Sequence, residues 1–199
     1  KAAAEIAIDS WRSSFCGNNL LQSPYLSIAT ARAGNVIGGG DWAKDRIVPD
    51  CVRSWIKKQS VQIRKPQATR PWQHVLEPLS GYLRLATELN QKMELHGEPF
   101  NFGPPAHQNH SVLELVQAMS KYWDKVRWEE ISSSQEQTYE SGLLKLNCDK
   151  ALNYLSWQAV LPFHETVRMT AEWYSSYYKN PSKILDLTFS QINEYKAFA

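Results

Sequence analysis

Apolar and polar positions along the chain define segments that alternate between helix and strand. An alanine-rich stretch from residue 2 to about residue 16 has helical spacing, and the run Gly17-Asn18-Asn19 ends it. Four short apolar runs are typical of strands, at residues 25–30, 61–64, 99–102 and 127–131. Five further segments have a helical pattern, at residues 45–59, 76–92, 111–124, 148–154 and 163–178. We expect loops at residues 66–71 and 132–142, and a weak helix or a tail after about residue 180.

The order of these elements favours an α/β fold, because strands alternate with helices through the first half of the chain. Ser111 and Glu114 have the spacing of a capping box at the start of a helix. A dinucleotide-binding fold carries a G-x-G-x-x-G turn after its first strand, and the glycines at 38–40 do not have this spacing. The chain also opens inside a helical pattern without an initiator methionine. We interpret it as a truncated chain that lacks the phosphate-binding first half of such a fold.

Composition narrows the class of protein. The 199 residues, 43% of them hydrophobic, suffice for one domain or a domain and a half. Lys and Arg number 22 against 20 Asp and Glu, so the net charge of +2 indicates neither a nucleic-acid binder nor a polybasic membrane protein. No apolar run reaches the roughly 20 residues that span a bilayer. Three widely spaced cysteines indicate neither a disulfide framework nor a zinc site, and a reducing cytoplasm is the simplest setting.

The most informative candidate for binding chemistry is the segment at residues 32–49, which follows a strand. Ligands of doubly wound sheets lie outside the carboxyl ends of strands, and glycines there let the backbone approach a ligand. Asn35 offers an amide donor, and Arg46 lies near an expected helix start, where free N–H groups attract anions. The alternative is a glycine turn beside a solvated arginine, and the residues alone slightly favour it.

A second candidate lies around Arg70, beside a proline and a tryptophan. A guanidinium binds phosphate through two parallel hydrogen bonds, which suits a diphosphate. Packing of Arg70 on Trp72 is an equally good explanation. His74 is interpreted as a structural histidine rather than a base, because no Ser or Cys nucleophile is evident near it.

Three further features have mainly structural interpretations. Asn101 stands between two aromatic residues at a strand end, where it reaches a ligand or caps the following turn. Glu129 and Glu130 are neighbours on a strand and point to opposite faces, so they do not form a catalytic pair. The aromatic stripe at 173–178 is expected to be core or a subunit contact rather than a stacking platform for bases.

Two long motifs carry a resemblance to a known family. R-A-G-N-V-I-G-G-G-D-W-A-K-D-R-I-V-P-D at 32–50 and R-P-W-Q-H-V-L-E-P-L-S-G-Y at 70–82 resemble, in order and spacing, the CDP-glucose 4,6-dehydratase group. This group belongs to the NAD-dependent epimerase/dehydratases, which are extended short-chain dehydrogenases/reductases. Weaker likeness covers F-N-F-G-P, S-V-L-E-L-V, L-K-L-N-C-D-K-A and the W-Y-x-x-Y helix. The resemblance therefore extends over almost the whole chain.

The resemblance implies a fold and a division of the chain. It implies the C-terminal part of a Rossmann-type doubly wound fold plus a smaller mixed α/β substrate-binding domain. Residues 1–60 would be the end of the NAD-binding domain with a substrate-binding insert. Residues 61–199 would be mainly the substrate-binding region, with segments that return to the Rossmann core. The helix after Lys1 would pack against its twin in a homodimer.

The resemblance also implies roles for single residues. Lys1 would be the lysine of the Tyr-x-x-x-Lys pair, a catalytic residue that holds the nicotinamide ribose and lowers the pKa of the tyrosine by its charge. Val36 would contact the cofactor. The substrate-binding residues would be Asn35 and Arg70 at the diphosphate, Arg46 at the start of the substrate-binding helix, Ile63 and Arg64 beside the base, and Asn101 at the phosphate or ribose end of the pocket.

The implied reaction is an NAD-dependent dehydration of CDP-glucose to CDP-4-keto-6-deoxyglucose, in a pathway to 3,6-dideoxyhexoses of O-antigen type. A hydride leaves sugar C4, water is lost across C5 and C6, and the hydride returns to C6. The glycine loop for NAD and the catalytic tyrosine would precede Lys1, so the 199 residues alone are not expected to catalyse. Two positions depart from the usual sequence of the group. Near residues 139–146 the group usually has His-Glu followed by Tyr-Leu-Lys-Leu, and at the position of Ser156 it usually has glycine.

Two other functions stay open at this point. One is a related nucleotide-sugar epimerase, decarboxylase or reductase, which a product lighter by one water would exclude. The other is a non-catalytic nucleotide-sugar-binding protein, which a tyrosine four residues before Lys1 would exclude.

Overall fold

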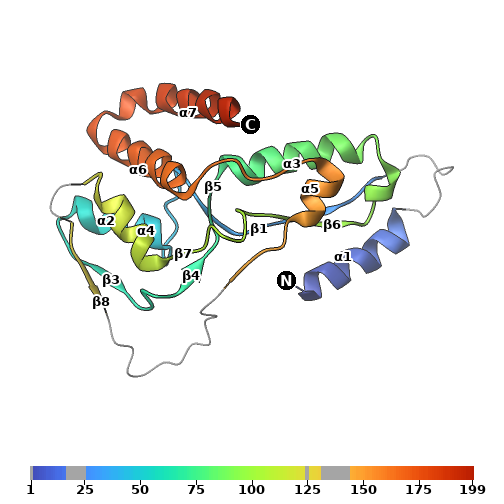
Figure 1. Cartoon of the computed structure of the whole chain (residues 1–199), viewed down its shortest axis with the longest axis horizontal. Helices are drawn as coiled ribbons and strands as arrows, with labels where there is room; N and C mark the ends of the chain where they lie inside the picture. Colours follow the sequence, from blue (N-terminus) through green and yellow to red (C-terminus); the bar gives the residue numbers. More distant parts are fainter. Residues whose placement is uncertain (1, 17–25, 124–125, 131–143) are drawn as a thin grey trace.

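A computed structural model describes residues 2–16, 26–123, 126–130 and 144–199 of the chain (Figure 1). Four pairs of strands organise the described residues, and three of these pairs are parallel. Helices lie between the paired strands in sequence, because parallel neighbours cannot be joined by a tight turn. This is the α/β arrangement that the alternating sequence pattern predicts.

One hydrophobic core surrounds the parallel pair of β1 (Thr30–Ala33) and β6 (Pro99–Phe102). Figure 1 shows a helix below this pair and two helices above it, which are α1 (Ala2–Phe15), α3 (Leu76–Leu89) and α5 (Asp149–Leu155). Gly81 lets α3 approach the sheet, since a Cβ there would lie 2.2 Å from the ring of Phe102. The turn η1 (Met93–Leu95) leads back from α3 to β6.

A second core lies at the opposite end of the molecule, at the left of Figure 1. Strands β3 (Val61–Ile63) and β8 (Trp128–Glu130) pair in parallel there. Two helices, α2 (Ile47–Ile56) and α4 (Val112–Ser120), contribute buried side chains to the same core. The antiparallel pair of β4 (Thr69–Arg70) and β7 (His110–Ser111) borders it.

The two cores are joined by the parallel pair of β2 (Asn35–Ile37) and β5 (Trp72–His74). The long helix α6 (Phe163–Lys179) packs on β5 and on α4. The turn η2 (Pro181–Lys183) then reverses the chain into α7 (Ile184–Phe198), which packs along α6. The β2–β5 pair therefore lies under the C-terminal helices, and it carries two of the motif segments identified in the sequence.

Several predicted elements are confirmed, and the capping box is one of them. The Ser111 hydroxyl accepts from the backbone N–H of Glu114 at 3.1 Å, and the Glu114 carboxylate accepts from the backbone N–H of Ser111 at 2.6 Å. Charge-assisted bonds of this kind lower the pKa of the Glu114 carboxyl. The predicted strand at 99–102 has the predicted bounds.

Three predictions about elements were wrong. The strand expected at 25–30 begins only at Thr30, because residues 26–29 are not in a strand and the pairing partner of Thr30 is the first residue of β6. The segment expected as a loop at 66–71 contains β4, whose partner β7 comes from far along the chain. The weak helix or tail expected after residue 180 is the 15-residue helix α7. The loop expected at 132–142 and Lys1 lie outside the described residues, and the division at residue 60 stays a prediction.

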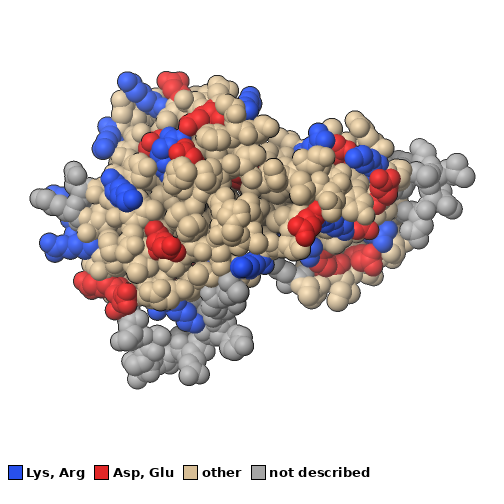
Figure 2. Space-filling view, viewed as in Figure 1, with Lys and Arg blue, Asp and Glu red and all other residues tan. Residues whose placement is uncertain are grey.

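On the face in Figure 2, basic and acidic side chains are interspersed among neutral ones. Cys16, Cys51 and Cys148 are free thiols. Within the ranges that the structure describes, no helix is long and apolar enough to cross a membrane, and no group of three or more His, Cys, Asp or Glu side chains could hold a metal ion.

Candidate functional site

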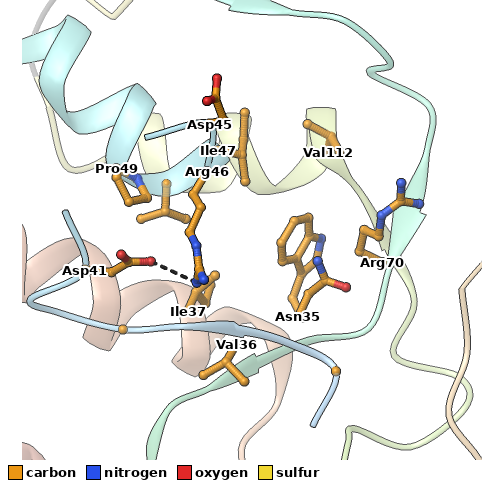
Figure 3. Close-up of a pocket in the computed structure, with 14 residues that line it drawn as sticks. Asn35, Val36, Ile37, Asp41, Asp45, Arg46, Ile47, Pro49, Arg70 and Val112 are labelled. Atoms are coloured by element: carbon orange, nitrogen blue, oxygen red, sulfur yellow. Dashed lines mark hydrogen bonds and ion pairs between the residues drawn. The ribbon is translucent and has the colours of Figure 1, made fainter. Parts of the chain in front are cut away.

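A hollow of about 480 Å³ opens beside the core that α2 and α4 share with β3 and β8 (Figure 3). Its walls come from β2, from the loop that follows β2, from the first turn of α2 and from β4 and β5. Asn35, Arg46 and Arg70 all line this hollow, although they belong to different elements. The structure thus brings together Asn35 and Arg70, which the resemblance assigns to a diphosphate, and Arg46, which it assigns to the start of the substrate-binding helix.

Strand pairing places Asn35 and Val36. Both belong to β2, where Asn35 lies opposite Trp72 and Val36 opposite Gln73 of β5. Gly34 precedes them, and its backbone lies close to Pro71, since a Cβ at Gly34 would be 3.2 Å from that proline. Asn35 and Val36 are both half-buried and line the hollow.

Arg46 lies at the start of α2 and reaches back across the hollow. It is the N-cap residue, with an extended backbone that ends the preceding loop. Its guanidinium donates to the carboxylate of Asp41 at 3.3 Å, and Figure 3 shows the side chain directed toward that partner. The Arg46 side chain is 61% exposed, so it is accessible to a ligand in the hollow.

Arg70 occupies a more enclosed position. It belongs to β4 opposite His110, it is 8% exposed, and its guanidinium donates to the Thr69 carbonyl at 2.9 Å. The neighbouring Trp72 is also buried, and its indole N–H donates to the carbonyl of His110 at 3.0 Å. The β4–β7 pairing therefore fixes the backbone of Arg70 on the rim of the hollow.

A second hollow of about 590 Å³ adjoins the first, because Asp45, Ile47 and Val112 line both. Ile63 and Arg64, which the resemblance assigns to the base, line this second hollow. Ile63 is buried in β3, whereas Arg64 is exposed. The two adjoining hollows offer space for a ligand longer than either alone.

One described residue of the predicted site, Asn101, is not in these hollows. Asn101 lies in β6, and its side-chain amide donates to the carbonyl of Asn147 at 3.0 Å instead of lining either hollow. Lys1 lies outside the described residues. The structure therefore groups Asn35, Val36, Arg46 and Arg70, with Ile63 and Arg64 next to them, and leaves Asn101 apart.

Two acidic residues of the hollow were missed from the sequence. Asp41 lines it and pairs with Arg46, and Asp45 lines both hollows from a left-handed backbone conformation with φ 61°. Asp is among the few residues that tolerate this conformation. The sequence could have indicated both aspartates, because they lie within five residues of Arg46 in the long motif at 32–50.

His74 has the environment of a structural histidine. It is 2% exposed, and its Nδ1 accepts from the backbone N–H of Leu76 at 3.4 Å. Burial, with a smaller contribution from the charge of Arg168, lowers its pKa from 6.5 to about 4. A neutral imidazole at ordinary pH fits the interpretation made from the sequence.

Comparisons with known proteins show similarity to enzymes that act on nucleotide sugars. No family model matches it. It is 37% identical over 186 residues to the CDP-glucose 4,6-dehydratase of Salmonella typhimurium, which covers 93% of this chain. The chain spans about half the length of this relative, 51%, and matches its C-terminal half. The resemblance predicted from the two long motifs is confirmed.

Solved structures confirm the Rossmann-type fold. The UDP-glucose-4-epimerase of Stenotrophomonas maltophila, with bound NAD and formylated UDP-arabinopyranose, matches with a TM-score of 0.72 at 19% identity, over 90% of this chain and 54% of that one. The dTDP-glucose 4,6-dehydratase of Bacillus anthracis, in complex with NAD, matches with a TM-score of 0.65 at 19% identity. This match covers 94% of this chain and 53% of the dehydratase chain.

Proposed function

We propose that this chain is the nucleotide-sugar-binding part of an NAD-dependent dehydratase that converts CDP-glucose to CDP-4-keto-6-deoxyglucose. The observation that carries the proposal is the convergence of Asn35, Arg46 and Arg70 on one hollow from β2, α2 and β4. The identity to a CDP-glucose 4,6-dehydratase supports the choice of substrate and reaction.

The chemistry of these three residues suits a diphosphate. Two guanidinium groups supply charged donors in a planar arrangement that matches phosphate oxygens, and the Asn35 amide supplies a neutral donor. Ile47, Pro49 and Trp72 add apolar surface to the lining of the same hollow. The adjoining hollow, with Ile63 and Arg64, would take the cytidine end of the ligand.

NAD would supply a hydride acceptor and donor at its nicotinamide ring. Val36 fits a contact with this cofactor, because it is a half-buried apolar residue in the wall of the same hollow. The sequence contains no G-x-G-x-x-G turn, so the pyrophosphate of NAD would be held by residues other than those described. The role of this chain is to bind and orient the nucleotide sugar beside the cofactor.

A homodimer built through α1 belongs to the same proposal. None of the residues of α1 is buried, and Ile6 and Phe15 are each 72% exposed. Trp11 and Ile8 add further exposed apolar surface on this helix. Light scattering on the complete polypeptide tests this part, and a monomer would contradict it.

The test of the reaction uses the complete polypeptide that contains this chain, incubated with CDP-glucose and NAD. The expected product is lighter than the substrate by one water, as measured by mass spectrometry. A product of unchanged mass would instead indicate an epimerase, and loss of carbon dioxide from a uronic acid substrate a decarboxylase. Absence of both binding and conversion would contradict the proposal.

Arg70→Ala tests the site. It should weaken binding of CDP-glucose by a few kcal/mol at most, because a charged hydrogen-bond partner of the diphosphate is lost. Arg127→Ala, in the segment before β8 and outside both hollows, is the matched control. Equal affinities for the two variants would contradict the assignment of Arg70.

A further inference from the structure

The loop at residues 38–46, between β2 and α2, carries both Asp41 and Arg46 into the hollow. From the side of α2, the Arg53 guanidinium donates to the carbonyls of Trp42 at 2.9 Å and Ala43 at 3.2 Å. The loop is therefore tied by its backbone to the helix that follows it.

The loop is also held by α6, more than a hundred residues further along the chain. Trp42 packs against three tyrosines of α6, with ring centroids 5.2, 5.1 and 6.1 Å away, which are Tyr174, Tyr177 and Tyr178. Gly39 of the loop lies on the ring of Trp173, where a Cβ would be only 2.0 Å from a ring atom. We call Trp173, Tyr174, Tyr177 and Tyr178 the α6 aromatic cluster.

One residue connects this cluster to the arginine of the site. The carbonyl of Asp41 accepts a hydrogen bond of 2.6 Å from the hydroxyl of Tyr174. The carboxylate of Asp41 accepts from the backbone N–H of Ala43 at 2.9 Å through one oxygen, and from the Arg46 guanidinium at 3.3 Å through the other. Asp41 thus joins α6 to Arg46 through two hydrogen bonds, one at its backbone carbonyl and one at its carboxylate.

Tyr174 is suited to a fixed donor role. Its side chain is fully buried, and burial raises the pKa of its hydroxyl, so the proton stays on the oxygen at ordinary pH. The hydroxyls of Tyr177 and Tyr178 have no hydrogen-bond partner among the residues that the structure describes. Within the cluster, Tyr174 is therefore the tyrosine that acts on the loop by more than packing.

We propose that Tyr174 is a positioning residue for nucleotide-sugar binding, which fixes Asp41 so that Asp41 holds the Arg46 guanidinium in the hollow. This inference rests on the proposed function of Arg46. An exposed arginine loses rotamer entropy when a ligand fixes it, and a preorganised one loses less. The Asp41 contact uses one of the five N–H donors of Arg46, which leaves others for phosphate oxygens.

The test is a double-mutant cycle on the complete polypeptide, with the dissociation constant for CDP-glucose measured by calorimetry. Tyr174→Phe keeps the ring and removes the hydroxyl, and should weaken binding roughly three- to tenfold, as for one hydrogen bond. Tyr177→Phe removes a hydroxyl from the same cluster and should leave the affinity unchanged. In an Arg46→Ala background, Tyr174→Phe should have no further effect on affinity, because its route to the ligand is gone.

A second measurement follows the loop without ligand. Hydrogen exchange of the backbone amides at 41–46 should be faster in Tyr174→Phe than in Tyr177→Phe. Equal effects of Tyr174→Phe in the presence and absence of Arg46 would overturn the inference while leaving the proposed function intact. Unchanged affinity in Arg46→Ala alone would overturn the assignment of Arg46 and the inference with it. Absence of CDP-glucose binding by the unmodified protein would overturn the proposed function, whatever the exchange rates.

Discussion

The carboxylate of Glu77 accepts a hydrogen bond of 2.9 Å from the hydroxyl of Tyr195, which joins α3 to the C-terminal helix α7. The same carboxylate accepts from the backbone N–H groups of Val160 at 2.8 Å and Leu161 at 2.6 Å. Glu77 is 1% exposed, and burial raises the pKa of its carboxyl against the opposing effect of these donors. Glu77 therefore connects three distant segments within the protein interior.

Removal of this carboxylate should destabilise the protein strongly. Glu77→Ala leaves the buried backbone N–H of Leu161 and the half-buried one of Val160 without an acceptor, so we expect a loss of about 3 kcal/mol in the free energy of unfolding. Tyr195→Phe removes a single hydroxyl and should cost about 1 kcal/mol. Urea unfolding of the complete polypeptide measures both. Glu129→Ala, at an exposed position on β8, is the control and should change little. A loss in Glu77→Ala no larger than that in the control would contradict the role of this carboxylate.

The lowered pKa of His74 predicts a dependence of stability on pH. The pKa is 6.5 for an ordinary histidine and about 4 in the folded protein, so between these values the unfolded chain binds the additional proton. The contribution of His74 to stability is therefore complete above about pH 6.5 and is lost as the pH falls toward 4. It amounts to at most about 3 kcal/mol.

Unfolding at several pH values, in the wild type and in His74→Asn, measures this contribution. Carboxyl groups titrate in both proteins, so only the difference between the two curves reports on His74. We expect stability to fall more steeply in the wild type than in the variant between pH 6.5 and 4. Parallel curves would show that burial of His74 does not control the acid sensitivity.

Sequence patterns predicted local features of this fold well. The capping box at Ser111 and the strand at 99–102 depend on neighbouring residues, and both are as expected. The bounds of β1, by contrast, depend on its pairing with the distant strand β6. Gly97 donates its backbone N–H to Ile28 at 2.7 Å, and the ladder with β6 begins only at Thr30. An apolar run alone does not contain this information.

The helix α7 was underestimated for a related reason. Its buried residues include Gln191, whose amide donates to the carbonyl of Met169 at 2.8 Å, and Tyr195. Polar groups that are buried because they find partners on α6 and α3 do not appear in the sequence as an apolar stripe.

In the candidate site too, local motifs were predictable and long-range contacts were not. The long motifs indicated Arg46 and Arg70, whereas the contact between Tyr174 and Asp41 joins positions 133 residues apart.

The close approach of Gly39 to Trp173 predicts a specific steric effect. Gly39→Ala would place its Cβ 2.0 Å from the Trp173 ring, so the loop or the ring must move. We expect a loss of about 1–3 kcal/mol in the free energy of unfolding, as for overpacking. In a Trp173→Leu background the same substitution should cost less, because the ring is gone. Equal costs in both backgrounds would exclude this contact as the cause.

Ser156 ends α5 in a conformation that glycine adopts more easily. Its backbone is left-handed, with φ 50° and ψ 37°. The backbone N–H of Ser156 donates to the Leu152 carbonyl at 3.0 Å, and that of Trp157 donates to the Ala151 carbonyl at 3.2 Å. The bond from Ser156 is that of the αL motif, in which the residue at this position is most often glycine.

Ser156→Gly should therefore stabilise the protein, by about 0.5–1 kcal/mol. A side chain costs roughly 1–2 kcal/mol in this conformation, and the greater entropy of glycine in the unfolded chain offsets part of the gain. Ser176→Gly, inside α6, is the matched control and should destabilise by a similar amount, because the same replacement then falls in a right-handed helix. Opposite signs in urea unfolding would identify backbone conformation as the cause. A loss of stability in both variants would show that the left-handed backbone at Ser156 carries no strain that glycine relieves.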